Sequence, residues 1–275
     1  MTAPGVGLYS IGVRGVTVPD LLAWTARHGI PFVHLRGGAR GYDLARQERA
    51  TLQSWRRCAE QSVPVTGVTA DLDLADFLTA DEPARARART ELERLAAATV
   101  VLGAGWVRLL GRTAPQNRLC QAMRGTVLPT VAVPLLVELH HPGWLEPAAL
   151  SALHVLLQRQ PQLRLLADTA QLAAAIPSAG GEANIALQRV LGFARVLHLS
   201  DDGAGLDTAG HTMVAVRAAD RIVNGQDIEI AFEWTGQPRT TQECWDRYRA
   251  ACRWWAKIWA HPSAGAIGCS FDHDR

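Results

Sequence analysis

Four apolar runs in the second half of the chain each end in a residue that can bind a metal ion. These residues are Glu138, Asp168, His198 and Glu233, and successive positions lie 30, 30 and 35 residues apart. One strand plus one helix takes about 30 residues in a (β/α)8 barrel, which builds its site at the carboxyl ends of its strands. The spacing therefore predicts that the four side chains meet at one end of such a barrel.

Three carboxylates and one imidazole are an oxygen-rich donor set suited to a divalent metal ion. Side chains alternate along a strand, so His140 should share a face with Glu138. Buried carboxylates are costly without a positive partner. Arg36 and Arg108, near other strand ends, could supply that charge, and Asp168 could instead cap a helix. A divalent cation would neutralise the set with fewer groups, and we favour that interpretation.

The bulk composition is that of an ordinary globular protein, with 275 residues, 48% hydrophobic, 20% charged and a net charge of +2. This near-neutral charge argues against electrostatic binding of nucleic acid. The chain lacks both a signal-peptide pattern and an apolar run near the ~20 residues that cross a bilayer. Its five cysteines form no Cys-x-x-Cys pair, so we expect no membrane association and a reducing, cytoplasmic location.

The single lysine of the chain, Lys257, lies in a Trp-rich stretch expected to form the last helix. Schiff-base chemistry needs a desolvated lysine inside the site. A lysine on an outer helix cannot supply one, so this class of barrel reaction is excluded.

Eight short apolar segments alternate with helical patterns. The expected strands are 7–13, 31–36, 63–68, 106–110, 134–140, 163–167, 196–200 and 228–233. The expected helices are 18–28, 44–61, 82–102, 116–128, 147–159, 182–193 and 241–259. This alternation predicts an α/β fold, a (β/α)8 TIM barrel formed as a single domain by residues 1–260.

One unit departs from the alternation. Residues 201–226, between the seventh and eighth strands, begin with glycines and continue with an apolar, arginine-containing stretch at 212–223. We expect an irregular insertion here, a strand pair or a lid, in place of a regular helix. Residues 261–275 are rich in Gly, Ser and Ala, which predicts a flexible C-terminal tail.

From Leu8 to about Trp259 the chain resembles the xylose isomerase-like barrels, the sugar phosphate isomerase/epimerase superfamily. The motifs that carry the resemblance are Val137-Glu138-Leu139-His140, Ala167-Asp168-Thr169, His198-Leu199-Ser200-Asp201, Phe232-Glu233 and the run from Gly29 to Arg36. Three positions depart from the family pattern. Gln171 replaces a histidine, Ser200 replaces a lysine and His34 replaces a glutamate.

The resemblance implies that Glu138, Asp168, His198 and Glu233 bind Mn²⁺, Mg²⁺ or Co²⁺, with Zn and Fe also compatible. Glu138 and Glu233 would exchange a proton with opposite faces of a sugar-like hydroxy-carbonyl substrate, through a metal-stabilised enediolate. This predicts a metal-dependent isomerase or epimerase. Because the surrounding residues are altered, we expect a substrate from specialised metabolism. The residues expected to bind it are His34, Arg36, His140, Gln171 and His211.

Other functions stay open at this point. A metal-dependent dehydratase, resembling the dehydroshikimate dehydratases, starts with the same proton abstraction but expels a hydroxyl group. An endonuclease IV-like enzyme would need more histidines at the strand ends. A degenerate barrel that only binds a ligand should have lost metal ligands first. Apart from the small-molecule substrate, the expected partner is another copy of the chain, in a dimer or tetramer.

Overall fold

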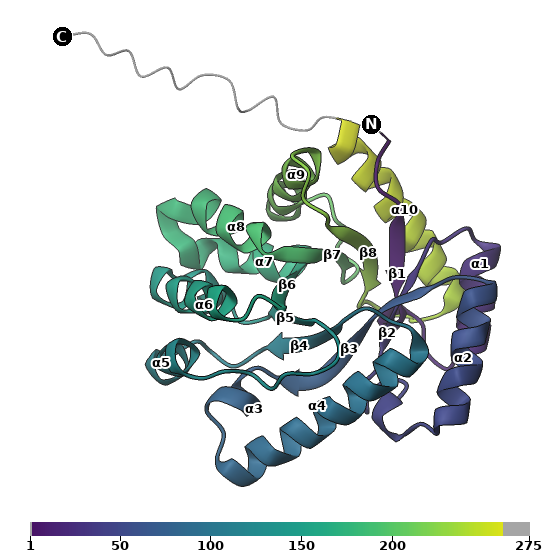
Figure 1. The fold of residues 1–275 in the computed structure, drawn as a ribbon. Helices are drawn as coiled ribbons and strands as arrows, with labels where there is room; N and C mark the ends of the chain where they lie inside the picture. The colour runs from purple at the N-terminus through teal and green to yellow at the C-terminus, as the bar shows by residue number, and fades with distance from the viewer. Residues whose placement is uncertain (1, 261–275) are drawn as a thin grey trace.

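Parallel strands close into a barrel with the helices outside it in the computed structural model, which describes residues 2–260 (Figure 1). The eight strands of this range are β1 (Val6–Tyr9), β2 (Val33–Arg36), β3 (Val65–Asp73), β4 (Val107–Gly111), β5 (Leu135–Leu139), β6 (Leu163–Asp168), β7 (Ala194–Asp201) and β8 (Glu229–Trp234). Each strand pairs with the next, and β8 closes the barrel against β1. The predicted TIM barrel is therefore confirmed.

Helices follow the strands, and seven of the ten within residues 2–260 lie where the alternation predicted a helix. The ten helices are α1 (Val18–Arg27), α2 (Arg49–Gln61), α3 (Ala75–Leu78), α4 (Glu82–Leu102), α5 (Asn117–Gly125), α6 (Pro147–Arg159), α7 (Thr169–Ala175), α8 (Ala183–Gly192), α9 (Ala209–Val223) and α10 (Thr241–Ala260). The ends of α4 match the prediction because they are coded locally. Asp81 accepts a hydrogen bond from the Ala84 N–H at its start, and Gly103 ends it with φ of 86°.

The prediction of an irregular insertion after β7 is wrong, because residues 209–223 form the regular helix α9. Thr208 caps it by accepting a hydrogen bond from the His211 N–H. Its buried positions are Val214, Ala215, Ala218 and Ala219, which follow the helical period and pack against α7 and α10. Alanines give a weak apolar signal in sequence, and Gly203 and Gly205 lie in the loop before the helix, with Gly210 in its first turn.

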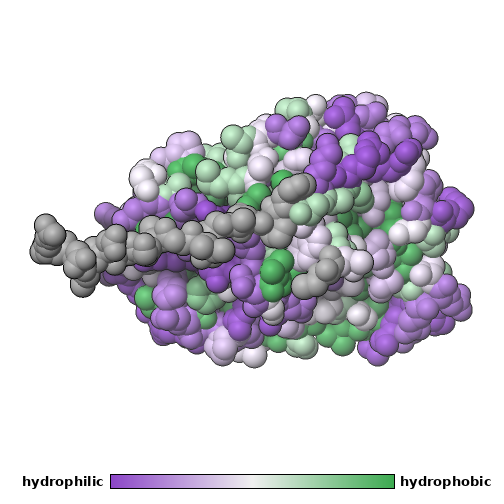
Figure 2. Space-filling view, turned by 90° about the horizontal axis from the view of Figure 1, so that it is seen from above, coloured by the Kyte–Doolittle hydropathy of each residue, from purple (hydrophilic) through white to green (hydrophobic). Residues whose placement is uncertain are grey.

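The core fills both the barrel and the layer between barrel and helices. In α10 the Trp254, Trp255 and Trp259 side chains are buried against the barrel, whereas Lys257 is exposed on the outer surface. That position confirms that the lysine cannot reach the barrel interior. The face seen in Figure 2 mixes hydrophilic and apolar residues. None of the helices within residues 2–260 combines the length and the apolarity that crossing a bilayer needs. The predicted tail lies outside the described residues.

Candidate active site

The four residues at the strand ends meet inside the barrel mouth. Glu138, Asp168, His198 and Glu233 are all buried, and one potential ligand atom from each lies within 4.8 Å of the others. Strand register brings them together, because Asp168 pairs with His198 and Ser200 with Glu233 across neighbouring strands. We call these four residues the quartet. The spacing of the sequence predicted this cluster, and the structure forms it.

Glu138 lies between two positively charged or protonatable partners. Arg108, on β4, places Nε 2.8 Å from Glu138 Oε2, and His140 places Nε2 3.1 Å from Glu138 Oε1. Burial raises the pKa of Glu138, but Arg108 and His140 outweigh it and lower the value to about 2. Glu138 is therefore ionised at any physiological pH.

The Arg108 guanidinium is itself fixed by the barrel wall. Its Nη1 donates to the Ala70 carbonyl at 3.0 Å, and Nη2 lies 3.4 Å from the Tyr9 hydroxyl. The atoms facing each other across the ion pair, Arg108 Nε and Glu138 Oε2, lack hydrogen-bond alignment despite their short separation. Glu138 Oε2 is thus a buried carboxylate oxygen that is ion-paired with Arg108 but accepts no hydrogen bond within residues 2–260.

Glu233 and Asp168 have the opposite electrostatics. Burial, followed by repulsion from neighbouring carboxylates, raises the pKa of Glu233 to about 8 and that of Asp168 to about 7. Asp168 accepts hydrogen bonds from the Ser200 hydroxyl and from the Gln171 N–H, the latter at 2.9 Å. Three carboxylates that cannot all ionise together are the arrangement a divalent cation would relieve. The donor set therefore fits a metal ion.

A line of hydrogen bonds holds His198 from below. Its Nε2 lies 3.0 Å from His34 Nδ1, and His34 Nε2 lies 2.5 Å from Glu229 Oε1. Burial lowers the pKa of both imidazoles to about 4, so both are neutral. If His34 donates to the Glu229 carboxylate, its Nδ1 accepts the His198 Nε2–H. His198 Nδ1, 2.8 Å from Glu233 Oε2, then carries the lone pair that a metal ion requires.

The structure places His34, which we expect to bind substrate, beneath the quartet. Its side chain is fully buried there and contacts His198, Glu229 and the Trp106 ring. This geometry suits a residue that orients His198, and a role of His34 in substrate binding stays a prediction.

Of the other predicted substrate-binding residues, His140, Gln171 and His211 lie near quartet residues, and Arg36 does not. His140 is partly exposed beside Glu138. Gln171 is half-buried at the start of α7 and meets Asp168 through its backbone. His211 is half-buried, and burial lowers its pKa despite a hydrogen bond with the Ser200 backbone. Arg36, at the end of β2, places Nη2 3.9 Å from Asp71 Oδ1 and lines a separate cavity.

Two site residues were not predicted as such. The sequence suggests Arg108 only as a source of positive charge in place of a metal ion. A lone arginine inside the apolar strand 106–110 is nevertheless a strong sign of a buried ion pair. Tyr9 stacks on His198 with ring centroids 5.1 Å apart, and its hydroxyl is 2.7 Å from Thr69 Oγ1. In the sequence, Tyr9 comes directly before Ser10 in a short apolar run, and nothing in this pattern indicates a functional role for it.

No protein-family model matches the chain, and no curated protein matches it in sequence. Solved structures do match. The chain is similar to a xylose isomerase domain containing protein from Salmonella typhimurium LT2, with 14% identity, a TM-score of 0.62 and coverage of 93% of this chain and 99% of that chain. The chain has the xylose isomerase-like barrel fold.

Two further structures share this fold. An L-ribulose 3-epimerase matches over 100% of both chains, with 15% identity and a TM-score of 0.65. The IolI protein, with a bound zinc atom, matches over 94% of this chain and 99% of its own, with 12% identity and a TM-score of 0.63.

Proposed function

We propose that the protein is a divalent-metal-dependent isomerase or epimerase of a sugar-like hydroxy-carbonyl compound. The observation that carries this proposal is the buried quartet, whose four ligand atoms lie within 4.8 Å of one another at the carboxyl ends of the strands. The names of similar structures, an L-ribulose 3-epimerase and a zinc-containing protein, agree with such a reaction and such a site.

Glu138, Asp168, His198 and Glu233 would hold the metal ion, and Mn²⁺, Mg²⁺, Co²⁺ and Zn²⁺ all suit this donor set. When bound, the metal would polarise the substrate carbonyl and stabilise the negative charge that develops as the neighbouring C–H proton leaves. The remaining steps belong to the side chains of the chain itself.

The two glutamates differ in their fitness as bases. In the metal-free protein the pKa of Glu233 is raised to about 8, so its carboxylate is the more basic of the two. Glu138, held ionised by Arg108 and His140, has a pKa of about 2 and is a weak base. We therefore assign the main proton transfer to Glu233 and the second, opposite-face transfer to Glu138, with His140 aiding it.

The direct test is metal binding followed by product analysis. Titration of the metal-free protein with Mn²⁺ should show one strong site, and Asp168→Asn should weaken it. Sugar-like substrates incubated in deuterated water should acquire one deuterium at the epimerised or isomerised carbon. A protein without affinity for Mn²⁺, Co²⁺ or Zn²⁺ would overturn the proposal. Loss of water in place of isomerisation would assign the dehydratase reaction instead.

A further inference from the structure

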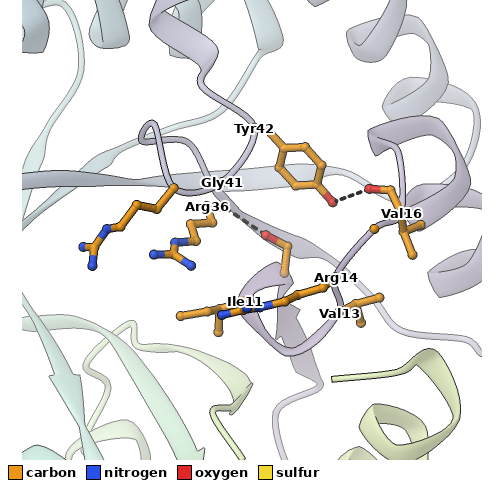
Figure 3. A pocket seen from close by; sticks show the side chains of 10 residues that line it. Ile11, Val13, Arg14, Val16, Arg36, Gly41 and Tyr42 are labelled. Atoms are coloured by element: carbon orange, nitrogen blue, oxygen red, sulfur yellow. Dashed lines mark hydrogen bonds between the residues drawn. The ribbon is translucent and has the colours of Figure 1, made fainter. Parts of the chain in front are cut away.

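A polar cavity lies between the loops that follow β1 and β2. Its volume is about 600 Å³, within the range of small-molecule sites. Its lining residues are Ser10, Ile11, Val13, Arg14, Gly15, Val16, Arg36, Arg40, Gly41 and Tyr42. Figure 3 shows Arg14 and Arg36 with their guanidinium groups on the same side, away from the Tyr42 ring. Three arginines in one cavity are the feature to explain.

The positive charge of this cavity is only partly neutralised. Asp71 accepts two hydrogen bonds from the Arg40 guanidinium, at 3.0 and 2.7 Å, and lies 3.9 Å from Arg36. Arg14 forms no ion pair within residues 2–260. A fourth arginine, Arg239, lies on the next loop, where its carbonyl accepts a hydrogen bond from the Arg14 N–H at 3.2 Å. Two of the guanidinium groups, those of Arg36 and Arg40, thus share the Asp71 carboxylate, whereas the Arg239 guanidinium donates to the Gly236 and Thr235 carbonyls.

The loops that carry these arginines are fixed to each other. Ser10 Oγ accepts a hydrogen bond from the Arg36 N–H at 2.8 Å, which joins the ends of β1 and β2. The Tyr42 hydroxyl donates to the Val16 carbonyl at 3.2 Å, which joins the two loops. A Cβ on Gly41 would approach the Arg36 carbonyl oxygen to 2.0 Å, so the turn that closes the cavity needs glycine. The backbone positions that carry Arg14 and Arg36 are therefore fixed relative to each other.

The cavity adjoins the quartet. Ser10 lines it, and the preceding residue, Tyr9, stacks on His198 of the quartet. Burial and the positive charges of Arg14 and Arg36 lower the pKa of Arg239, while the Glu233 carboxylate raises it. Arg239 is therefore within electrostatic reach of both the arginine cavity and the quartet.

We infer that the cavity between Ser10, Arg14, Arg36 and Arg40 binds an anionic group, phosphate or carboxylate, at the far end of the substrate. Guanidinium groups match such oxyanions in geometry and charge. This inference deepens the proposed function, on which its substrate part rests. It departs from the neutral sugar in the name of the similar L-ribulose 3-epimerase.

The test separates anion binding from metal chemistry. Inorganic phosphate and acetate are titrated calorimetrically into the metal-free full-length protein in chelator. We expect saturable phosphate binding, weakened at least about tenfold by Arg14→Gln with Arg36→Gln, since each removes charge-assisted hydrogen bonds. Arg57→Gln, an exposed arginine on α2, is the matched control and should bind phosphate as the wild type does.

Two further arms keep the outcome decisive. Arg14 is exposed on a loop, so the single variant Arg14→Gln should fold normally and still weaken phosphate binding. Glu233→Gln should lack turnover but bind phosphate as the wild type does. Phosphate binding is therefore tested independently of the proposed reaction. Stronger binding of phosphate or of acetate identifies the anion.

Equal phosphate affinity in wild type and double variant, or no saturation in either, overturns the inference. So does a substrate survey in which a neutral sugar reacts faster than its phosphorylated and carboxylated forms.

Discussion

The two sides of the barrel mouth hold similar carboxylates in opposite electrostatic states. On the β4–β5 side, Arg108 and His140 keep Glu138 ionised, with a pKa of about 2. On the β6–β8 side, burial and neighbouring carboxylates raise the pKa of Glu233 to about 8. The difference lies in the partners and not in burial, since both side chains are nearly inaccessible. In the metal-free protein one glutamate is therefore ionised near neutral pH, and the other holds a proton.

The strongest test of this asymmetry is the pair of substitutions Glu233→Gln and Glu138→Gln. Glu233→Gln should lower kcat by about 10²–10⁴-fold, the usual contribution of a general base, with an unchanged circular dichroism spectrum. Steady-state kinetics at saturating Mn²⁺ measures it. Full activity in Glu233→Gln would end its role in proton transfer.

Arg108 tests the other side of the comparison. Arg108→Met should destabilise the metal-free protein by about 3–5 kcal/mol, because it leaves the Glu138 charge buried and unpaired. Added Mn²⁺ should recover part of this loss by replacing the missing charge. Denaturant unfolding with and without metal measures both effects. The double variant with Glu138→Gln should be more stable than Arg108→Met alone, and a less stable double variant would contradict the pairing.

The line from Glu229 to His198 predicts an effect on metal affinity. His34→Phe should weaken Mn²⁺ binding about 10–100-fold, as expected when the group that orients a ligating histidine is lost. Glu229→Gln should have a smaller effect in the same direction. Calorimetric titration measures both. A His34 variant with normal metal affinity but a raised KM would return His34 to substrate binding.

The pH dependence of the free energy of unfolding distinguishes the two sides of the barrel mouth without any substitution. The raised pKa values of Asp168 and Glu233, about 7 and 8, mean that the folded metal-free protein binds more protons than the unfolded chain. Its stability should therefore fall as the pH rises from 6.5 to 8, by an amount on the order of 1–2 kcal/mol. The pKa values of His34 and His198 are lowered to about 4, so these histidines affect the stability mainly below this pH range. Denaturant unfolding in chelator measures the slope, and Glu233→Gln should flatten it.

Gln171 should give the smallest effect. Its backbone N–H, not its side chain, bonds Asp168, so Gln171→Ala should leave Mn²⁺ affinity nearly unchanged. If its side chain reaches the substrate, KM should rise several-fold, by about the 0.5–1.5 kcal/mol of one hydrogen bond. Equal losses in metal and substrate affinity would place Gln171 closer to the metal.

The sequence by itself determined the barrel, the strand ends and the quartet. These follow from local patterns, because a parallel barrel gathers the carboxyl ends of its strands at one mouth whatever the details of packing. The same local logic set the ends of α4 through Asp81 and Gly103. It failed for α9, whose buried alanines differ too little from its exposed residues.

Tertiary structure decided how the quartet works, because charge and depth depend on residues that are distant in sequence. Arg108 on β4 reaches Glu138 on the neighbouring strand β5, and His34 reaches His198 across 164 residues. The residue types were visible in the chain, but only the closed barrel places His34 beneath the mouth. The arginine cavity likewise exists only because the loops after β1, β2 and β8 fold against each other. Spacing along a chain can predict which side chains meet, and only their packing sets the protonation state of each.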